Sequence, residues 1–235
     1  MKKVFVLFFV CIMILGLTTI AQSAPYPETQ KNLMAAVTGE TQANANYLAF
    51  ADVADKEGHN GLAAIFRAIA AAELKHANDE FEILKGLDNS VVKPTPTKAI
   101  TGTTKENLKA AIEGETEEYT IMYPAFIAVA QEEGMAAALR IFRFAARAEE
   151  VHAGIFTDLL NNFDNFDKVK YAHVYRCETC GNIILTNPSN CPICGVRAEN
   201  LIEYEIVKDE DRWGCNSGFV IAALGVLPFV VRRRK

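Results

Sequence analysis

Apolar side chains recur at intervals of three and four residues through the middle of the chain. Leu62, Ile65 and Ile69 show this spacing, which places such residues on one face of a helix. Ala, Leu, Glu and Gln dominate these segments and β-branched residues are sparse, as helix propensity favours. Glycines at Gly58 and Gly134 interrupt the pattern. The sequence therefore predicts four long helices, near residues 28–57, 60–87, 104–132 and 135–162.

The predicted helices form two copies of one unit. Residues 35–41 match residues 110–116 at an offset of 75, and beyond them the offset becomes 76. The second copy therefore has one extra residue, which lies between Thr116 and Tyr123 in the third helix. Because an insertion in a helix is usually absorbed as a π-bulge, we expect one there, and Pro124 disturbs the same region.

The connection between the second and third helices is long. It spans 16 residues, 88–103, and contains Pro94 and Pro96. A long middle crossover between two helix hairpins is the ferritin-like arrangement. The predicted fold is therefore mainly α, with a ferritin-like four-helix bundle over residues 28–165.

Each unit carries a Glu-x-x-His motif, which places two side chains on one helix face. One such motif is explained most simply by a solvated surface. Two motifs at repeat-equivalent positions, each preceded by a repeat-equivalent Gly-Glu, match the di-iron carboxylate pattern of helix bundles. Carboxylate oxygen with imidazole suits iron or manganese better than zinc. The six candidate ligands are Glu40, Glu73, His76, Glu115, Glu149 and His152.

Glu118 has no repeat partner, because the offset of 75 leads to Ala43. It lies one turn after Glu115, on the same face. Spacing leaves two interpretations open: a seventh ligand that makes the two metals unequal, or a solvated carboxylate in an acidic run. His59, in an interhelical turn, and His173 receive no metal role.

Four cysteines follow the helices in two Cys-x-x-Cys-Gly knuckles, with ten residues between the pairs: Cys177, Cys180, Cys191 and Cys194. Four thiolates form a tetrahedral site for zinc or iron, and the spacing does not choose between them. Two disulfides are the alternative in an exported protein. Short strands are expected at residues 172–176, 182–185 and 201–207. They outline a small domain, residues 171–210, that needs its metal to fold.

Charge is distributed unevenly along the chain. The formal net charge is −5, but six of the basic groups lie in residues 1–24 and 214–235, which have no acidic groups. The body between them carries 18 basic and 29 acidic groups. This acidity argues against nucleic acid as the main partner and, with clustered carboxylates, suggests cations.

The N-terminal residues 1–24 have the pattern of a secretory signal peptide. Two lysines precede an apolar run over residues 4–17, and small residues follow at Ala21, Ser23 and Ala24. We expect cleavage after Ser23 or Ala24 and export to the periplasmic or cell-envelope side. The alternative is an uncleaved membrane anchor.

The C-terminal residues 214–235 combine a Gly-Cys start, 13 apolar residues over 219–231, and a terminal Arg-Arg-Arg-Lys. A spanning helix needs about 20 residues, so the segment is only just long enough if the small residues from Cys215 are included. The basic end is expected to stay cytoplasmic. The segment resembles bacterial sorting signals, and a permanent tail anchor is the alternative, so we expect membrane attachment through this tail.

The order of motifs is specific. The sequence has GETQA at residues 39–43, AELKH at 72–76, GETEEY at 114–119 with MYP at 122–124, and AEEVH at 148–152. With the spaced cysteines, they make residues 28–213 resemble rubrerythrin, a ferritin-like di-iron bundle followed by a rubredoxin-like domain with one iron held by four cysteines. The resemblance implies two irons in the bundle and one in the four-cysteine site.

The resemblance also implies a role for each ligand. Glu73 and Glu149 bridge the irons, Glu115 and His152 hold one iron, and Glu40 holds the other. That second iron is expected to move between Glu118 and His76 as its oxidation state changes. Tyr47 and Tyr123 match tyrosines that hydrogen-bond the ligating carboxylates.

The function implied by the resemblance is a peroxidase that reduces hydrogen peroxide to water. The four-cysteine iron centre returns electrons one at a time across a head-to-tail homodimer. Family members are typically cytoplasmic and fed from reduced pyridine nucleotide, which an exported chain cannot reach, so the electron donor is unidentified. A ferroxidase, or an iron-binding or storage protein, is the alternative, although storage has no need of a one-electron relay.

Overall fold

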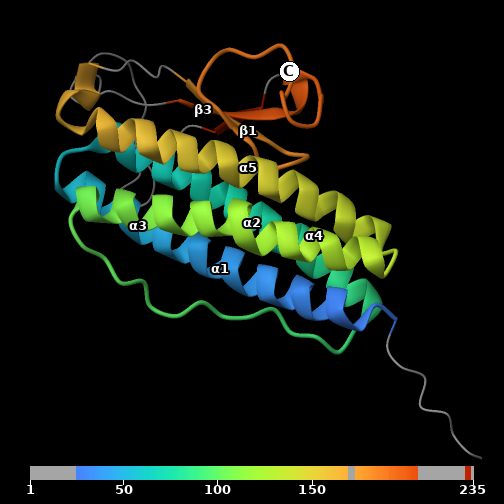
Figure 1. The fold of residues 1–235 in the computed structure, drawn as a ribbon. Helices are drawn as coiled ribbons and strands as arrows, with labels where there is room; N and C mark the ends of the chain where they lie inside the picture. The colour runs from blue at the N-terminus through green and yellow to red at the C-terminus, as the bar shows by residue number, and fades with distance from the viewer. Residues whose placement is uncertain (1–24, 169–172, 206–230, 234–235) are drawn as a thin grey trace, which may run out of the picture.

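The computed structural model describes residues 25–168, 173–205 and 231–233 of the 235-residue chain. Two antiparallel helix hairpins lie side by side and form a four-helix bundle (Figure 1). The first hairpin consists of α1 (Pro27–Lys56) and α2 (Asn60–Leu87). Gly58 makes the turn between them with φ of +86°, which glycine adopts without steric cost.

In the second hairpin, the third long helix is divided into three parts. It comprises α3 (Thr104–Glu117), a π-helical turn η1 (Glu118–Met122) and α4 (Tyr123–Glu132), and it is followed by α5 (Ala136–Asn161). A capping box of Thr103 and Glu106 starts α3. The π-helical turn lies at the predicted insertion, and Pro124 is tolerated because it falls in the first turn of α4. The four predicted helices and the π-bulge are therefore confirmed.

The crossover, residues 88–103, runs extended along the outside of the bundle beside α1 (Figure 1). The Gln42 side chain on α1 accepts a hydrogen bond from the Thr97 backbone N–H at 2.8 Å and donates to its carbonyl at 3.2 Å. Lys93 donates to Asn78 of α2 at 2.6 Å. These contacts attach the crossover to the first hairpin and give the ferritin-like connection that the sequence predicts.

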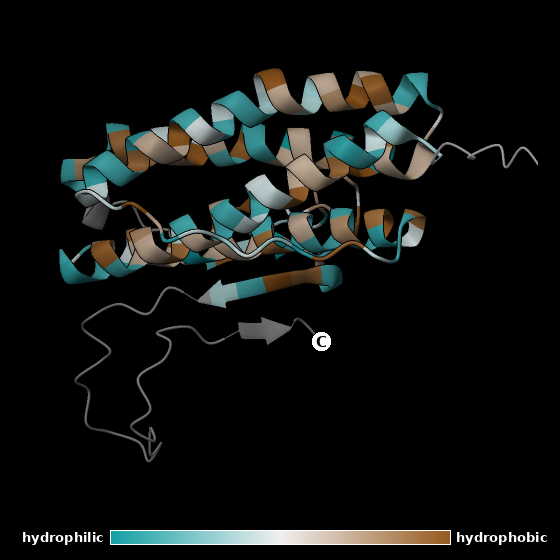
Figure 2. Cartoon of the chain, turned by 90° about the horizontal axis from the view of Figure 1, so that it is seen from below, coloured by the Kyte–Doolittle hydropathy of each residue, from teal (hydrophilic) through white to brown (hydrophobic). Residues whose placement is uncertain are grey.

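Apolar side chains fill the bundle in two clusters. The first includes Tyr47, Phe66 and Phe156, and the second includes Tyr123 and Phe142. Hydrophilic and hydrophobic residues alternate around each helix, as amphipathic packing requires (Figure 2). One tyrosine in each cluster points its hydroxyl at a buried carboxylate, so both clusters border the polar centre of the bundle.

The C-terminal part of the described chain is a small antiparallel sheet of order β2-β1-β3-β4. Its strands are β1 (His173–Cys177), β2 (Ile183–Ile184), β3 (Leu201–Glu205) and β4 (Val231–Arg233). The 3₁₀ helices η2 (Phe163–Lys168) and η3 (Ala198–Asn200) precede β1 and β3. Val174, Ile183 and Ile202 belong to the same apolar cluster as Phe66 of α2. The small domain therefore packs on the bundle, against α2 and α5 (Figure 1).

The two predicted end segments fall largely outside the described residues. The predicted signal peptide, residues 1–24, does so entirely. Of residues 214–235, the structure describes only β4, which pairs with β3 through Tyr204 and Val231. Within the described ranges, no helix combines the length and apolar character needed to cross a bilayer.

Candidate metal centres

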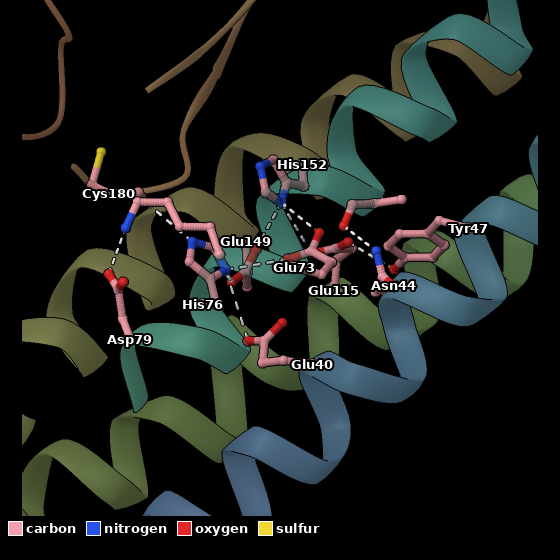
Figure 3. Close-up of polar contacts among 12 residues, drawn as sticks. Glu40, Asn44, Tyr47, Glu73, His76, Asp79, Glu115, Glu149, His152 and Cys180 are labelled. Atoms are coloured by element: carbon pink, nitrogen blue, oxygen red, sulfur yellow. Dashed lines mark hydrogen bonds and ion pairs between the residues drawn. The ribbon is translucent and has the colours of Figure 1, made fainter. Parts of the chain in front are cut away.

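Six predicted ligands converge at the centre of the bundle from all four long helices (Figure 3). They form two groups, and within each group the ligand atoms lie within 4.8 Å of one another. One group consists of Glu40, Glu73, His76 and Glu149, and the other of Glu73, Glu115, Glu149 and His152. Glu73 and Glu149 belong to both groups, which is the arrangement expected of carboxylates that bridge two ions.

The distances follow the twofold repeat of the sequence. Glu149 Oε1 lies 2.8 Å from His76 Nδ1, and its Oε2 lies 2.7 Å from His152 Nδ1. Glu73 Oε2 lies 3.2 Å from His76 Nδ1, and its Oε1 lies 3.1 Å from His152 Nδ1. Each shared carboxylate thus directs one oxygen to each histidine.

The residues fit a pair of metal ions. Glu40, Glu73, Glu115 and Glu149 are all fully buried, and Glu40 Oε2 and Glu115 Oε2 have no hydrogen-bond partner among the described residues. Such atoms each cost on the order of 1–3 kcal/mol unless something else binds them. Two cations in contact with carboxylate and imidazole would satisfy them.

The pKa values of the ligands indicate which of them carry protons when no metal is bound. Burial raises the pKa of Glu149, but His76 and His152 outweigh it and lower the value to about 2. Burial would lower the pKa of both histidines, yet the surrounding carboxylates hold these values well above the ordinary one. Burial, with Glu73, raises the pKa of Glu115 to about 8. Protons therefore neutralise the metal-free cluster, and metal binding would release them.

Both predicted tyrosines hydrogen-bond ligand carboxylates. Tyr47 donates to Glu115 Oε1 at 2.7 Å, and Tyr123 donates to Glu40 Oε1. Such bonds orient a ligand and set its basicity. Tyr123 also lies 2.9 Å from Glu80 Oε1, a contact that the sequence did not suggest.

Glu118 begins the π-helical turn, half-buried beside Gly39 of α1. Burial, followed by the charges of Glu115 and Glu149, holds its pKa well above the ordinary value. It is close to the centre but belongs to neither four-residue group. Its role as a ligand stays a prediction.

The four cysteines form the second centre. Their sulfurs lie within 4.8 Å of one another, with 3.5 Å between Cys177 and Cys194 and 3.6 Å between Cys180 and Cys191. A disulfide would need about 2.05 Å, whereas four sulfurs each ~2.3 Å from a central ion lie ~3.8 Å apart. The arrangement therefore fits a tetrahedral metal site and not the disulfide alternative.

The two centres touch. Cys180 lies in the first knuckle, and its backbone carbonyl oxygen is 3.1 Å from His76 Nε2. A Cβ atom on the next residue, Gly181, would lie 2.0 Å from the same nitrogen. Gly181 has φ of +76°, so glycine is required both for the turn and for the approach of the histidine. Arg147 of α5 donates to the Ile193 carbonyl at 3.1 Å and supports the same interface.

Sequence reasoning missed Glu80 and this contact. Glu80 follows His76 by one helical turn, a spacing that could have drawn notice. Its repeat-equivalent position is Phe156, so a search for paired ligands passes over it. The contact between the centres has no local signal, because 104 residues separate its partners.

These features define a class: ferritin-like di-iron carboxylate proteins that carry an additional four-cysteine domain. The Rubrerythrin family matches residues 31–160, and the chain belongs to this family. Its members are generally oxidoreductases that serve in defence against oxidative stress. The cofactors are accordingly two irons in the carboxylate–histidine site and one in the four-cysteine site.

The relatives cover most of the chain. Rubrerythrin of Porphyromonas gingivalis is 36% identical over 75% of this chain and 90% of its own length. Nigerythrin of Nitratidesulfovibrio vulgaris is 39% identical over 71% and 81%. A structure of fully reduced nigerythrin has 35% identity and a TM-score of 0.71, over 82% of this chain and 92% of that one. A bacterioferritin of Mycobacterium tuberculosis, at 21% identity and a TM-score of 0.53, shares the fold.

Proposed function

We propose that the protein is a peroxidase that reduces hydrogen peroxide to water at the di-iron site, with electrons delivered through the four-cysteine centre. The observation that carries the proposal is the 3.1 Å contact between His76 Nε2 and the Cys180 carbonyl. It joins a candidate ligand of one centre to a candidate ligand of the other. An electron relay needs such a connection, and storage of iron does not.

The reaction consumes two electrons and two protons for each peroxide and yields two waters. When bound, the two ferrous ions supply the electron pair that cleaves the O–O bond. The buried ligands exclude water from the site, and Tyr47 and Tyr123 orient Glu115 and Glu40. We further propose that Glu118 and His76 are alternative ligands of one ion, since they differ in charge and lie on different helices.

Rapid mixing of the fully reduced protein with peroxide and with oxygen tests this function. We expect fast reoxidation by peroxide and slow reoxidation by oxygen, with three irons and no zinc per chain. Faster reaction with oxygen, followed by accumulation of ferric iron beyond three per chain, would instead support the ferroxidase or storage alternative.

The relay can run within one chain or between two. In the described structure the contact forms inside a single chain. The family resemblance implies a head-to-tail homodimer, in which the same contact would join partner chains. Mixed dimers of a Cys180→Ser chain and a His76→Ala chain decide this. Recovered turnover with a reductant would show a relay between chains, and its absence in confirmed mixed dimers would show a relay within each chain.

We also propose that the protein is exported and attached to the membrane through its C-terminal tail. The support is the charged, apolar and small-residue pattern of residues 1–24 and the matching basic end of residues 214–235. Attachment of this tail to the membrane would require β4 to separate from β3. The mature N-terminus should then begin near Ala24 or Pro25. Native protein that starts at Met1 and resists external protease in spheroplasts would contradict this. The electron donor would be one available at the cell envelope.

A further inference from the structure

Glu80 is a buried carboxyl group that the two metal groups leave unused. It lies on α2 one turn after His76, with 1% of its surface exposed. One oxygen, Oε1, lies 2.9 Å from the Tyr123 hydroxyl, while Oε2 is buried without a hydrogen-bond partner among the described residues. An ionised carboxylate in this setting would be costly. The sequence repeat does not explain the presence of Glu80 either, since Phe156 occupies the equivalent position.

The protonation of Glu80 follows from the number of hydrogens that Tyr123 can donate. The Tyr123 hydroxyl has a single hydrogen, yet it lies within hydrogen-bond distance of two carboxyl groups, Glu40 and Glu80. One of the two must therefore carry a proton and donate to the tyrosine oxygen. Glu40 faces the metal groups and must be ionised to bind an ion. The proton thus belongs on Glu80, and the bonds run from Glu80 to Tyr123 to Glu40.

Burial raises the pKa values of both Glu40 and Glu80, so the assignment of the proton to Glu80 depends on the ionisation of Glu40 when it binds metal. Burial is the largest influence on Glu80 and raises its pKa to about 8, although His76 and Tyr123 oppose the increase. The charged or titratable groups that act on Glu80 are Glu40, His76, Asp79, Lys93, Tyr123 and Glu149.

Glu80 also borders a small cavity at the junction of the bundle and the four-cysteine domain. The cavity is lined in addition by His76, Asp79, Phe144, Thr179 and Cys180. The Asp79 side chain is 42% exposed, so the cavity lies next to solvent. A proton given up by Glu80 can therefore be replaced from water on this side.

We propose that Glu80 is a positioning residue that holds a proton beside the di-iron site and supplies it through Tyr123. This rests on the proposed peroxidase function. When the O–O bond is cleaved by two electrons, the departing oxygen must gain a proton. The Tyr123 proton passes by way of Glu40 Oε1 to the departing oxygen, and the Glu80 carboxyl proton replaces it on the Tyr123 oxygen. A proton from solvent, carried by water in the cavity, then returns to Glu80.

An infrared comparison of the iron-loaded protein tests the protonation without any turnover. Wild type should show the C=O stretch of a protonated carboxyl that shifts in heavy water, and Glu80→Gln should lack this band. Asp79→Asn is the matched control, since it removes a neighbouring carboxylate that lines the same cavity but is exposed and paired with Lys75. The control should keep the band. If Glu80→Gln keeps this band, the proposal is overturned.

A single turnover of the reduced protein with peroxide tests the delivery. Glu80→Gln keeps a donor for Tyr123 but has no acidic proton, so its rate should fall at least about tenfold, within the roughly 10²- to 10⁴-fold range of general acid catalysis. Wild type should slow as the pH rises through the pKa of Glu80, whereas Glu80→Gln should show no such step. Asp79→Asn should keep a rate close to that of wild type at low pH and should still show the step, moved to lower pH because the Asp79 charge contributes to the raised pKa of Glu80.

The outcomes distinguish a failure of the Glu80 proposal from a failure of the proposed peroxidase function. A normal rate in Glu80→Gln together with a slow Glu80→Leu would show a merely structural hydrogen bond and overturn the proposal. If wild type does not react with peroxide, the peroxidase function fails and the delivery step with it, while the infrared band still decides whether Glu80 holds the proton.

Discussion

The two metal centres are assembled in opposite ways. The cysteine ligands come from two turns separated by ten residues, whereas the carboxylate–histidine ligands come from four helices and span residues 40 to 152. Apolar clusters border the bundle site on both sides, through Tyr47 and Tyr123. The small domain has short strands and an apolar cluster that includes three of its own cysteines. The bundle is therefore expected to hold its site in place without metal, whereas the small domain depends on its ion.

The largest effect should come from disrupting the four-cysteine centre. Cys180→Ser removes one of four ligands and should cost nearly all multiple turnover with a reductant, because the small domain loses its ion. A single turnover of pre-reduced di-iron with peroxide should remain nearly intact, and the helical circular dichroism should persist. Equal loss in both assays would show that the bundle depends on the small domain for folding.

Removal of the metal ions should make the stability of the bundle depend on pH. In the metal-free protein, burial raises the pKa values of Glu80 and Glu115 from 4.5 to about 8. Between pH 4.5 and about 8, the folded state keeps protons on these two carboxyl groups that the unfolded state has already released. The stability of the folded protein therefore falls as the pH rises across this range. The raised histidine pKa values act in the same direction above about 6.5.

Iron binds the deprotonated ligands, so it should stabilise the bundle more at pH 8 than at pH 6. The Tm difference between iron-loaded and metal-free protein should be at least about 2 °C greater at pH 8, the shift that ~1 kcal/mol produces in a domain of about 150–250 residues. Calorimetry of both forms at the two pH values measures it. A difference that is the same at both would contradict the buried, protonated cluster.

The junction between the centres should show an intermediate effect. Gly181→Ala would place a Cβ 2.0 Å from His76 Nε2, and it should slow reduction of the di-iron site by the four-cysteine centre about tenfold while both metal contents stay normal. Gly195→Ala is the matched control, since it has the same φ of +76° with no atom within 4 Å of the added Cβ. Both variants should lose ~1–2 kcal/mol of stability from the left-handed backbone, and Gly181→Ala should lose more because its Cβ overlaps His76. Equal rates in the two variants would show that the docking contact is not the relay.

The smallest effect concerns the asymmetry within the bundle site. Glu118→Ala should still bind two irons, since neither four-residue group contains Glu118. It should lose part of its preference for peroxide over oxygen, by a few-fold, because an anionic alternative ligand of one ion is missing. Rapid mixing of the reduced variant with both oxidants gives the ratio. An unchanged ratio would return Glu118 to a role as a half-buried surface residue.

Much of this molecule was predictable because its signals are local or repeated. Helical spacing placed the four helices, and the one-residue offset between the repeats located the π-helical turn at Glu118–Met122. The Glu-x-x-His pairs predicted the ligands because residues three apart share a helix face. The knuckles at Gly181 and Gly195 were predictable because each needs only a few consecutive residues.

Only the tertiary structure decided how these parts meet. That Glu73 and Glu149 are shared by both groups depends on helix packing, which spacing along one helix does not specify. Glu80 acquired significance only because Tyr123, 43 residues away, directs its single hydroxyl between two carboxyl groups. The contact of Cys180 with His76 required the small domain to fold back onto the bundle. Contacts between distant residues depend on how whole elements pack, so no short pattern in the sequence announces them.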